Sequence, residues 1–171
     1  MALITTVRVR QPAKNDLVGD RFVVSGIGAG FEGTIGLRLL GRRGAVLGTG
    51  FAQSAAGGVG VGEFSTTLDL DAPPRSISQV TLQVYGDNPG LPGEGPDPGF
   101  DLRETELTYV PRLRGFLLYR VRRGDTLSAI VRATRDLGRT TVAKIVATNP
   151  QITDPDHIEV GWRLRIPLQD R

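Results

Sequence analysis

The sequence predicts two domains: an all-β, immunoglobulin-like sandwich and, after it, a small α+β domain with the order β-α-α-β. Glycine is concentrated in the first part, with 20 of the 23 glycines before position 116. Charge divides at the same place, because residues 1–115 carry a net charge of −1 and residues 116–171 a net charge of +4. Hydrophobic residues alternate in the first part and recur at helical spacing in the second. We therefore expect the sandwich at residues 1–115, a linker at about 111–116 and the second domain at 117–169.

Seven short segments are predicted as the strands of the sandwich. They lie at residues 3–10, 21–26, 31–40, 44–52, 63–70, 79–85 and 104–110. Gly, Pro, Asn and Asp separate them, and none shows the 3.6-residue period of a helix. In the third segment, Phe31, Ile35, Leu37 and Leu39 fall on one face at period two. This pattern is typical of two antiparallel sheets that enclose one core.

The sandwich region contains two patterns that resemble functional motifs. Gly28, Gly30 and Gly33 match the spacing of the dinucleotide-binding fingerprint. That fingerprint requires a helix after the third glycine, whereas an alternating strand pattern follows here, so we expect no nucleotide site. The Gly- and Pro-rich segment 87–101 is expected to be a long surface connection in preference to a partner-binding loop.

Three short motifs of the sandwich resemble a known family. They are Phe31-Glu32-Gly33, the glycine-flanked GAVLG at 44–48, and Glu63-Phe64 before a strand. They resemble the immunoglobulin-like domain named for bacterial sporulation and spore germination proteins, over roughly residues 5–111. The resemblance implies a non-catalytic adhesion or interaction module. It also implies that Phe31 and Phe64 anchor the core and that Gly33 makes a tight backbone contact.

The second domain is expected to begin with a strand at 118–122 and a first helix. Asp125 or Thr126 can cap this helix with a side-chain oxygen. A buried helical stripe follows at i, i+3, i+4 and i+7, formed by Leu127, Ile130, Val131 and Thr134. Gly138 stands where a left-handed residue would end the helix.

A second helix and a final strand complete the expected order. Thr140 or Thr141 can cap the helix, which carries its apolar residues at 142, 145 and 146. Asn149-Pro150 is expected to end it, because proline cannot continue a helix. Residues 162–167 alternate and predict the last strand.

Fifteen positions of this domain closely resemble a LysM domain. The matching residues are Tyr119, Val121, Gly124, Asp125, Thr126, Leu127, Ile130, Asn149, Pro150, Ile152, Ile158, Gly161, Leu164, Ile166 and Pro167. One difference is the helix connection, because the 19 positions from Ile130 to Asn149 exceed the spacing usual in the family.

The LysM resemblance implies a shallow groove that binds glycans containing N-acetylglucosamine, such as peptidoglycan and chitin. The groove would lie between two loops formed by Gly124, Asp125, Thr126, Leu127, Asn149, Pro150, Gln151 and Ile152. Backbone N–H and C=O groups can pair with the N-acetyl amide, and small apolar side chains can accept its methyl group. Such recognition needs no ion, metal or nucleophile.

The arginine-rich surface of the second domain is a second candidate contact. We expect its partner residues to be Arg122, Arg123, Arg132, Arg135, Arg139 and Trp162. Nucleic acid is not expected as the partner, because the aromatic interleaving of RNA-binding surfaces is missing. A solvated face, an acidic protein or an anionic wall polymer suits the arginines better. A half-buried strand position is the favoured interpretation of Trp162 over stacking on a sugar.

Composition excludes several classes of site in the 171-residue chain. With no cysteine and a single histidine, His157, it has no disulfide framework, thiolate zinc site, cysteine nucleophile or multi-histidine centre. We expect no cofactor and no metal, and we expect His157 to be exposed. No stretch of about 18 apolar residues predicts membrane insertion, and no secretory segment is recognisable at the start. The cell envelope and a cytoplasmic assembly both stay open as locations.

Two functions compete on these observations. The favoured one is a non-catalytic protein whose LysM domain holds peptidoglycan or another N-acetylglucosamine polymer, with the sandwich as spacer or protein-interaction module. The alternative is a structural adaptor within a large assembly, such as a contractile tail baseplate, in which both domains contact protein subunits. A hydrolase ranks third, because Asp69 and Asp71 are expected to be two exposed carboxylates before a proline turn, and nothing in the sequence supplies a catalytic cleft around them.

Overall fold

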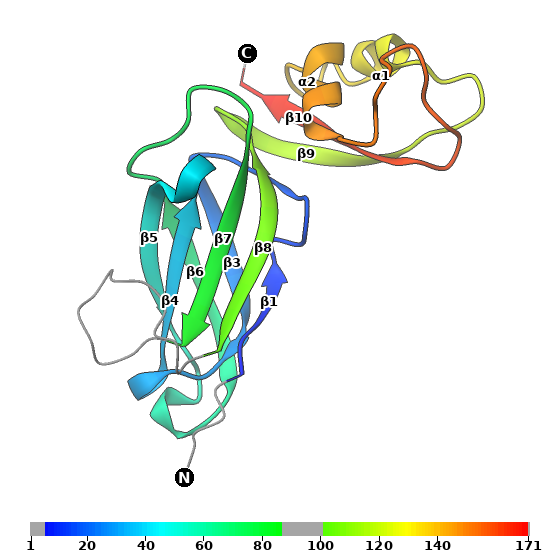
Figure 1. The fold of residues 1–171 in the computed structure, drawn as a ribbon. Coiled ribbons are helices and arrows are strands. Elements are labelled where there is room, and N and C mark those ends of the chain that lie inside the picture. Colours follow the sequence, from blue (N-terminus) through cyan, green and yellow to red (C-terminus); the bar gives the residue numbers. More distant parts are fainter. Residues whose placement is uncertain (1–5, 87–100, 171) are drawn as a thin grey trace. The chain divides into compact units, whose positions relative to one another are not determined.

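The computed structural model describes residues 6–86 and 101–170. The chain divides into two compact units. The first comprises the chain up to Asn15, Arg21–Pro73 and Gln79–Leu107, and the second comprises Asp16–Asp20, Pro74–Ser78 and the chain from Thr108 onward. Figure 1 shows strands alone in the body of the sandwich and both α-helices in the last third of the chain. Within the described residues, no helix has the length and apolar character needed to span a bilayer.

Two sheets form the sandwich. The smaller has the order β1-β3-β6, with β1 at Arg8–Gln11, β3 at Arg21–Gly28 and β6 at Gly62–Asp69. The larger has the order β2-β8-β7-β4-β5. Its strands are β2 (Leu17–Val18), β4 (Thr34–Leu40), β5 (Val46–Gln53), β7 (Ser78–Gly86) and β8 (Leu102–Tyr109). The expected all-β sandwich is therefore confirmed.

The sandwich core follows the predicted alternation with one exception. Ile35, Leu37 and Leu39 are fully buried, and Phe64 is 4% exposed. Phe31 is instead 48% exposed, so its prediction as a core anchor is wrong. It opens a one-turn 3-10 helix, Phe31–Gly33, ahead of β4, and period-two alternation does not extend into that turn.

Gly33 makes the tight backbone contact that the resemblance implied. Its φ is +81°, and a Cβ atom there would lie 2.7 Å from the carbonyl carbon of Gly57. Both features require glycine. Strand β4 begins directly after Gly33, at the place where the dinucleotide fingerprint would require a helix.

Strand ends differ from the predicted ones by a few residues, as ladder ends commonly do. The two-residue strand β2 was not predicted, because a pair of residues carries no readable period. Most of the connection expected at 87–101, and the beginning of the strand expected at 3–10, lie outside the described residues.

The second unit has the predicted order β-α-α-β. Its elements are β9 (Leu113–Arg120), α1 (Leu127–Ala133), α2 (Val142–Thr148) and β10 (Arg163–Gln169). The two strands pair antiparallel. Thr126 and Thr141 are the N-caps, and their hydroxyls accept from the amides of Ala129 and Lys144 at 3.1 and 3.2 Å. The core cluster contains Leu127 and Ile130 of α1, Ile145 of α2, and Leu164 and Ile166 of β10, and Leu117 and Tyr119 of β9 pack against it.

The long helix connection forms an extra strand contact. Helix α1 ends at Ala133, and Gly138 has no positive φ, so the prediction that Gly138 ends the helix in a left-handed conformation is wrong. Gly138 is needed for space, because a Cβ atom there would lie 3.0 Å from Leu168 Cβ. The next residue, Arg139, pairs with Gln169 through two backbone hydrogen bonds of 3.0 Å. Strand β9 also includes residues 113–116, which were expected to lie in the linker.

Candidate functional site

The first predicted loop, between β9 and α1, is organised by the Asp125 carboxylate. Its Oδ2 accepts hydrogen bonds from the Arg122 amide at 2.7 Å and from the Tyr119 hydroxyl at 2.8 Å. Gly124 permits the turn with a φ of +87°. The Arg122 amide, and then the Tyr119 hydroxyl, hold the pKa of Asp125 below its usual value, because both stabilise the anion. The same bond raises the pKa of Tyr119.

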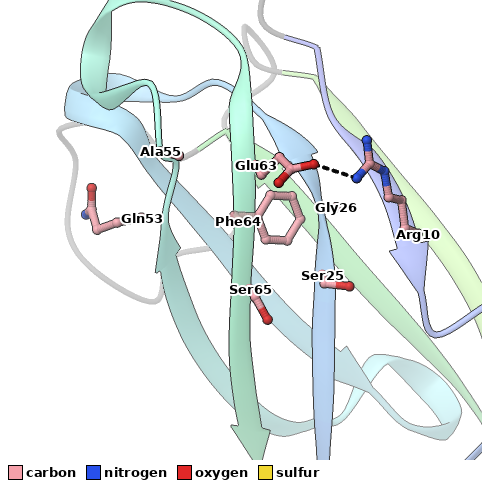
Figure 2. Close-up of a pocket in the computed structure, with 8 residues that line it drawn as sticks. All are labelled: Arg10, Ser25, Gly26, Gln53, Ala55, Glu63, Phe64 and Ser65. Carbon is pink, nitrogen blue, oxygen red and sulfur yellow. Dashed lines mark hydrogen bonds and ion pairs between the residues drawn. The ribbon is translucent and has the colours of Figure 1, made fainter.

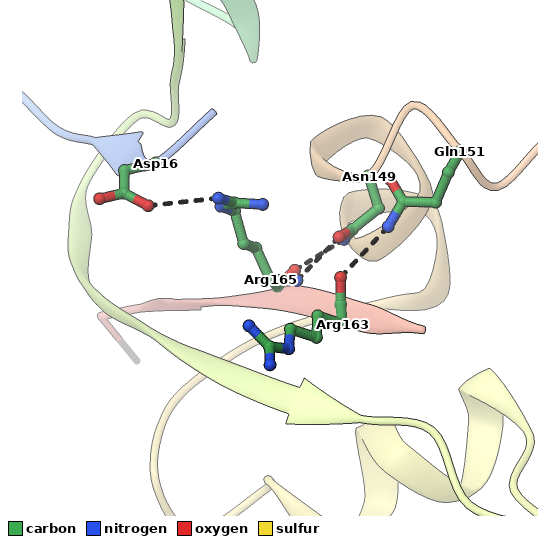
Figure 3. Close-up of polar contacts among 5 residues, drawn as sticks. All are labelled: Asp16, Asn149, Gln151, Arg163 and Arg165. Atoms are coloured by element: carbon green, nitrogen blue, oxygen red, sulfur yellow. Dashed lines mark hydrogen bonds and ion pairs between the residues drawn. The ribbon is translucent and has the colours of Figure 1, made fainter. Parts of the chain in front are cut away.

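The second predicted loop, between α2 and β10, is organised by the Asn149 side chain. Asn149 is 1% exposed. Its Oδ1 accepts from the Arg165 amide, and its Nδ2 donates to the Arg165 carbonyl, each at 2.7 Å (Figure 3). Nδ2 also donates to the carbonyl of Ile145 at 2.7 Å. The side-chain amide is therefore occupied within the domain.

Gln151 repeats this pattern at the domain surface. Its Nε2 donates to the Arg163 carbonyl at 3.2 Å (Figure 3). The Ile152 amide donates to the Asn149 carbonyl at 2.9 Å and closes the turn that contains Pro150 and Gln151. Pro150 and Gln151 are exposed.

A common core connects the two loops. Leu127 from the first and Ile152 from the second are 2% and 4% exposed and belong to one hydrophobic cluster. Of the eight predicted glycan residues, the side chains of Leu127, Asn149 and Ile152 are buried, Asp125 is half-buried, and Gly124, Thr126, Pro150 and Gln151 are exposed. The exposed members are uncharged, which suits backbone recognition of a neutral acetamido sugar.

The predicted arginine contacts come from separate elements. Arg122 and Arg123 follow β9, Arg132 lies in the last turn of α1, and Arg135 and Arg139 lie in the helix connection. All five are exposed, and none forms an ion pair within the described part of the chain.

Trp162 and His157 have the degrees of burial that the sequence predicted. Trp162 is partly buried and packs against the core cluster of the second unit, which confirms the half-buried interpretation. The side chain of His157 is 70% exposed, with its Nε2 3.9 Å from Glu159 Oε1. Among residues 6–86 and 101–170, no three His, Asp or Glu side chains are grouped to hold a metal ion.

One ion pair of the second unit escaped prediction. Arg165 Nη2 lies 3.4 Å from Asp16 Oδ1, and each side chain is 22% exposed (Figure 3). The two residues are 149 positions apart, and no local pattern relates them.

The sandwich carries an open hollow that sequence patterns did not indicate (Figure 2). It is lined by Arg10, Ser25, Gly26, Gln53, Ala55, Glu63, Phe64 and Ser65. Arg10 and Glu63 form an exposed ion pair of 2.8 Å at its rim. Exposed ion pairs of this kind contribute little to stability.

Comparison with known families matches both parts of the chain. Residues 6–90 match the immunoglobulin-like domain of bacterial spore germination, and residues 119–167 match the LysM domain. Over 48 residues the chain is 42% identical to an endolysin of Bacillus phage PZA, a segment that is 28% of this chain and 17% of the endolysin. The chain thus spans less than a fifth of that relative. The two resemblances are confirmed: the chain carries an immunoglobulin-like domain of bacterial spore germination followed by a LysM domain.

Proposed function

We propose that the chain is a non-catalytic binding protein whose LysM domain holds peptidoglycan or a related N-acetylglucosamine polymer through the loops at 122–127 and 149–152. The match of residues 119–167 to the LysM domain carries this proposal. The 42% identity to a segment of a phage endolysin supports it, because an endolysin acts on a cell wall. The immunoglobulin-like domain would serve as spacer or protein-interaction module.

The loop geometry supports recognition through the backbone. Asp125 and Asn149 are held by hydrogen bonds inside the domain, so both loops are rigid before a ligand arrives. A preorganised site loses little conformational entropy on binding. The two matched domains are binding modules, so we propose that binding is the whole activity.

Sedimentation of the full chain with purified peptidoglycan sacculi tests the proposal. We expect saturable co-sedimentation at both 50 and 500 mM NaCl, competition by the N-acetylglucosamine tetramer and no release of reducing sugar. The variant Pro150→Arg/Gln151→Arg adds bulk to an exposed loop and should weaken binding at least tenfold. Ala133→Arg/Ala143→Arg adds the same charge on exposed helix positions and should bind within twofold of the natural chain.

Three outcomes would overturn the proposal. The chain could remain in the supernatant at both salt concentrations. Binding could vanish at 500 mM NaCl, which would assign it to arginine attraction instead of a groove. The sacculi could be cleaved, which would contradict the absence of catalysis.

A structural adaptor is the second candidate. It is favoured by five exposed arginines that form no ion pair within residues 6–86 and 101–170, namely Arg122, Arg123, Arg132, Arg135 and Arg139. In this case the LysM domain would contact acidic protein subunits of a larger assembly. Failure to bind sacculi at any salt concentration would leave this candidate in place.

A further inference from the structure

In the LysM unit, β9 and β10 form a two-stranded ribbon, and its two outer edges differ in how many of their backbone groups are hydrogen-bonded. Val121 donates to the Trp162 carbonyl and accepts from the Gly161 amide, each at 2.9 Å, so its backbone faces β10. In an antiparallel pair the facing alternates residue by residue. The backbone groups of Arg120 and Leu118 therefore face the outer edge of β9, and those of Arg163 and Arg165 face the outer edge of β10.

The outer edge of β10 is largely occupied by groups of its own domain. Gln151 donates to the Arg163 carbonyl, and Asn149 pairs with both backbone groups of Arg165. Pro167 has no N–H to offer. Arg139 pairs with Gln169 in both directions. A further strand therefore finds few free backbone groups along this edge.

The outer edge of β9 is open at Leu118 and Arg120. Among the described residues, no group bonds to the outward N–H or C=O of Leu118 or Arg120. The opening ends at the next outward position, where Asp125 accepts from the Arg122 amide. Leu118 is 68% exposed, an uncommon exposure for leucine on an edge strand. Natural sheets usually cover or charge such an edge, and an open one is a template for a further strand.

The charges beside this edge indicate what the further strand would carry. Arg120 lies directly opposite Arg163 in the ladder, with Cβ atoms about 5 Å apart. Both arginines are exposed, and neither has an ion-pair partner among the residues described. Like charges at this position repel each other, and an acidic side chain on an added strand would lie beside Arg120, on the side away from Arg163, and would offset the repulsion by pairing with Arg120.

We propose that the open edge of β9 receives an extended segment of a partner protein, with an acidic residue opposite Arg120 and an apolar residue opposite Leu118. In antiparallel pairing the segment would read acid–x–apolar along its own chain. The added strand would gain backbone hydrogen bonds from the edge and specificity from the two side chains, as in other strand-addition complexes. This surface is separate from the proposed glycan loops and extends the function beyond glycan binding.

A second copy of the chain does not suit this edge. The longest antiparallel overlap of two β9 edges places Arg120 opposite Arg114 of the other copy, because only outward-facing residues pair. Two arginines would then oppose each other at both ends of the shared ladder. Charge complementarity at Arg120 therefore favours an acidic segment over the longest self-pairing.

NMR titration of the ¹⁵N-labelled full chain tests the proposal. The probe is a capped peptide, Thr-Thr-Glu-Thr-Val-Thr-Thr, and its control carries Lys in place of Glu. With up to 2 mM of the Glu peptide, we expect the largest amide shifts and new exchange protection at Leu118 and Arg120. Arg120→Glu should weaken binding at least tenfold, whereas Arg42→Glu, the same charge change at an exposed residue of the sandwich, should weaken it less than twofold.

A second variant separates strand addition from charge attraction. Leu118→Pro removes one outward N–H and leaves the ladder to β10 intact, so the domain should fold and lose the peptide. If Leu118→Pro fails to fold, the Arg120→Glu and Arg42→Glu pair decides alone. The proposal is overturned by unchanged shifts at Leu118 and Arg120, by equal losses in Arg120→Glu and Arg42→Glu, by equal binding of the Lys peptide, or by concentration-dependent self-association through β9. Competition by the N-acetylglucosamine tetramer would also overturn it, by assigning the peptide to the glycan loops.

Discussion

The side-chain amide of Asn149 imitates a β-strand toward Arg165: its oxygen accepts from the Arg165 amide and its nitrogen donates to the Arg165 carbonyl, both at 2.7 Å. The amide thereby ties the end of α2 to the outer edge of β10. A residue predicted from the LysM resemblance as part of the glycan loop is thus first a structural element of the domain.

Replacement of Asn149 by Ala should destabilise the LysM domain by about 2–4 kcal/mol, because the Arg165 amide loses its acceptor and the carbonyls of Ile145 and Arg165 each lose a donor. Trp162 is the chain's only tryptophan and packs on this core, so its fluorescence during urea unfolding reports the domain. Gln151→Ala removes one exposed hydrogen bond and should cost less than about 0.5 kcal/mol. Equal costs for the two variants would refute the structural role of Asn149.

Hydrogen exchange should distinguish the two edges of the ribbon. The Arg165 amide is bonded to Asn149, whereas the Leu118 amide has no bonded partner among the described residues. We expect the Leu118 amide to exchange at least about tenfold faster than that of Arg165 in the natural chain. In Asn149→Ala the difference should largely disappear. Slow exchange at Leu118 in the absence of a partner would show that its edge is covered.

The loop before α1 should lose stability in acid. Because hydrogen bonds from Arg122 and Tyr119 lower the folded pKa of Asp125, ionised Asp125 favours the folded loop. This contribution is present above the ordinary aspartate pKa of about 3.9 and is lost as pH falls through the lowered folded pKa. A ¹³C titration of the carboxyl group measures this pKa.

Tyr119→Phe provides the control for that titration. It removes the second donor and leaves the Arg122 amide, so the pKa of Asp125 should rise part of the way toward its usual value. An Asp125 pKa that is ordinary in the natural chain, or unaffected by Tyr119→Phe, would contradict the assigned cause.

Two glycines of the sandwich allow a matched test of close packing. Gly33 and Gly44 both have positive φ, at +81° and +76°, but only Gly33 has backbone within 4 Å of a built Cβ atom. Gly44→Ala should lower the free energy of unfolding by about 1–2 kcal/mol, because alanine disfavours a positive φ. Gly33→Ala should lower it by about 1–3 kcal/mol more, because the added Cβ atom meets Gly57. Calorimetry would detect each loss as a lower Tm of the sandwich. Equal costs would show that the contact relaxes freely.

Patterns along the chain predicted most of the secondary structure because they are local. The alternation of Ile35, Leu37 and Leu39 marks one strand face. The hydroxyls of Thr126 and Thr141 cap their helices by accepting hydrogen bonds from amides only three residues further along the chain. The predictions for Phe31 as a core anchor and for Gly138 as a left-handed helix end were wrong because local patterns are ambiguous at both positions. An apolar residue next to a strand and a glycine beyond a helix each suit two local structures, and only packing selects one.

The sequence by itself determined the two domains, their strands and helices, and the position of the LysM loops. Tertiary structure alone decided which side chains those loops leave exposed, that Asn149 is buried, and that β10 has a covered edge while β9 has an open one. It also brought Asp16 to Arg165 across 149 positions. The physical reason is that periodicity specifies the face on which a residue lies. The group that covers a strand edge comes from a distant segment, and its position depends on the register and packing of the folded chain.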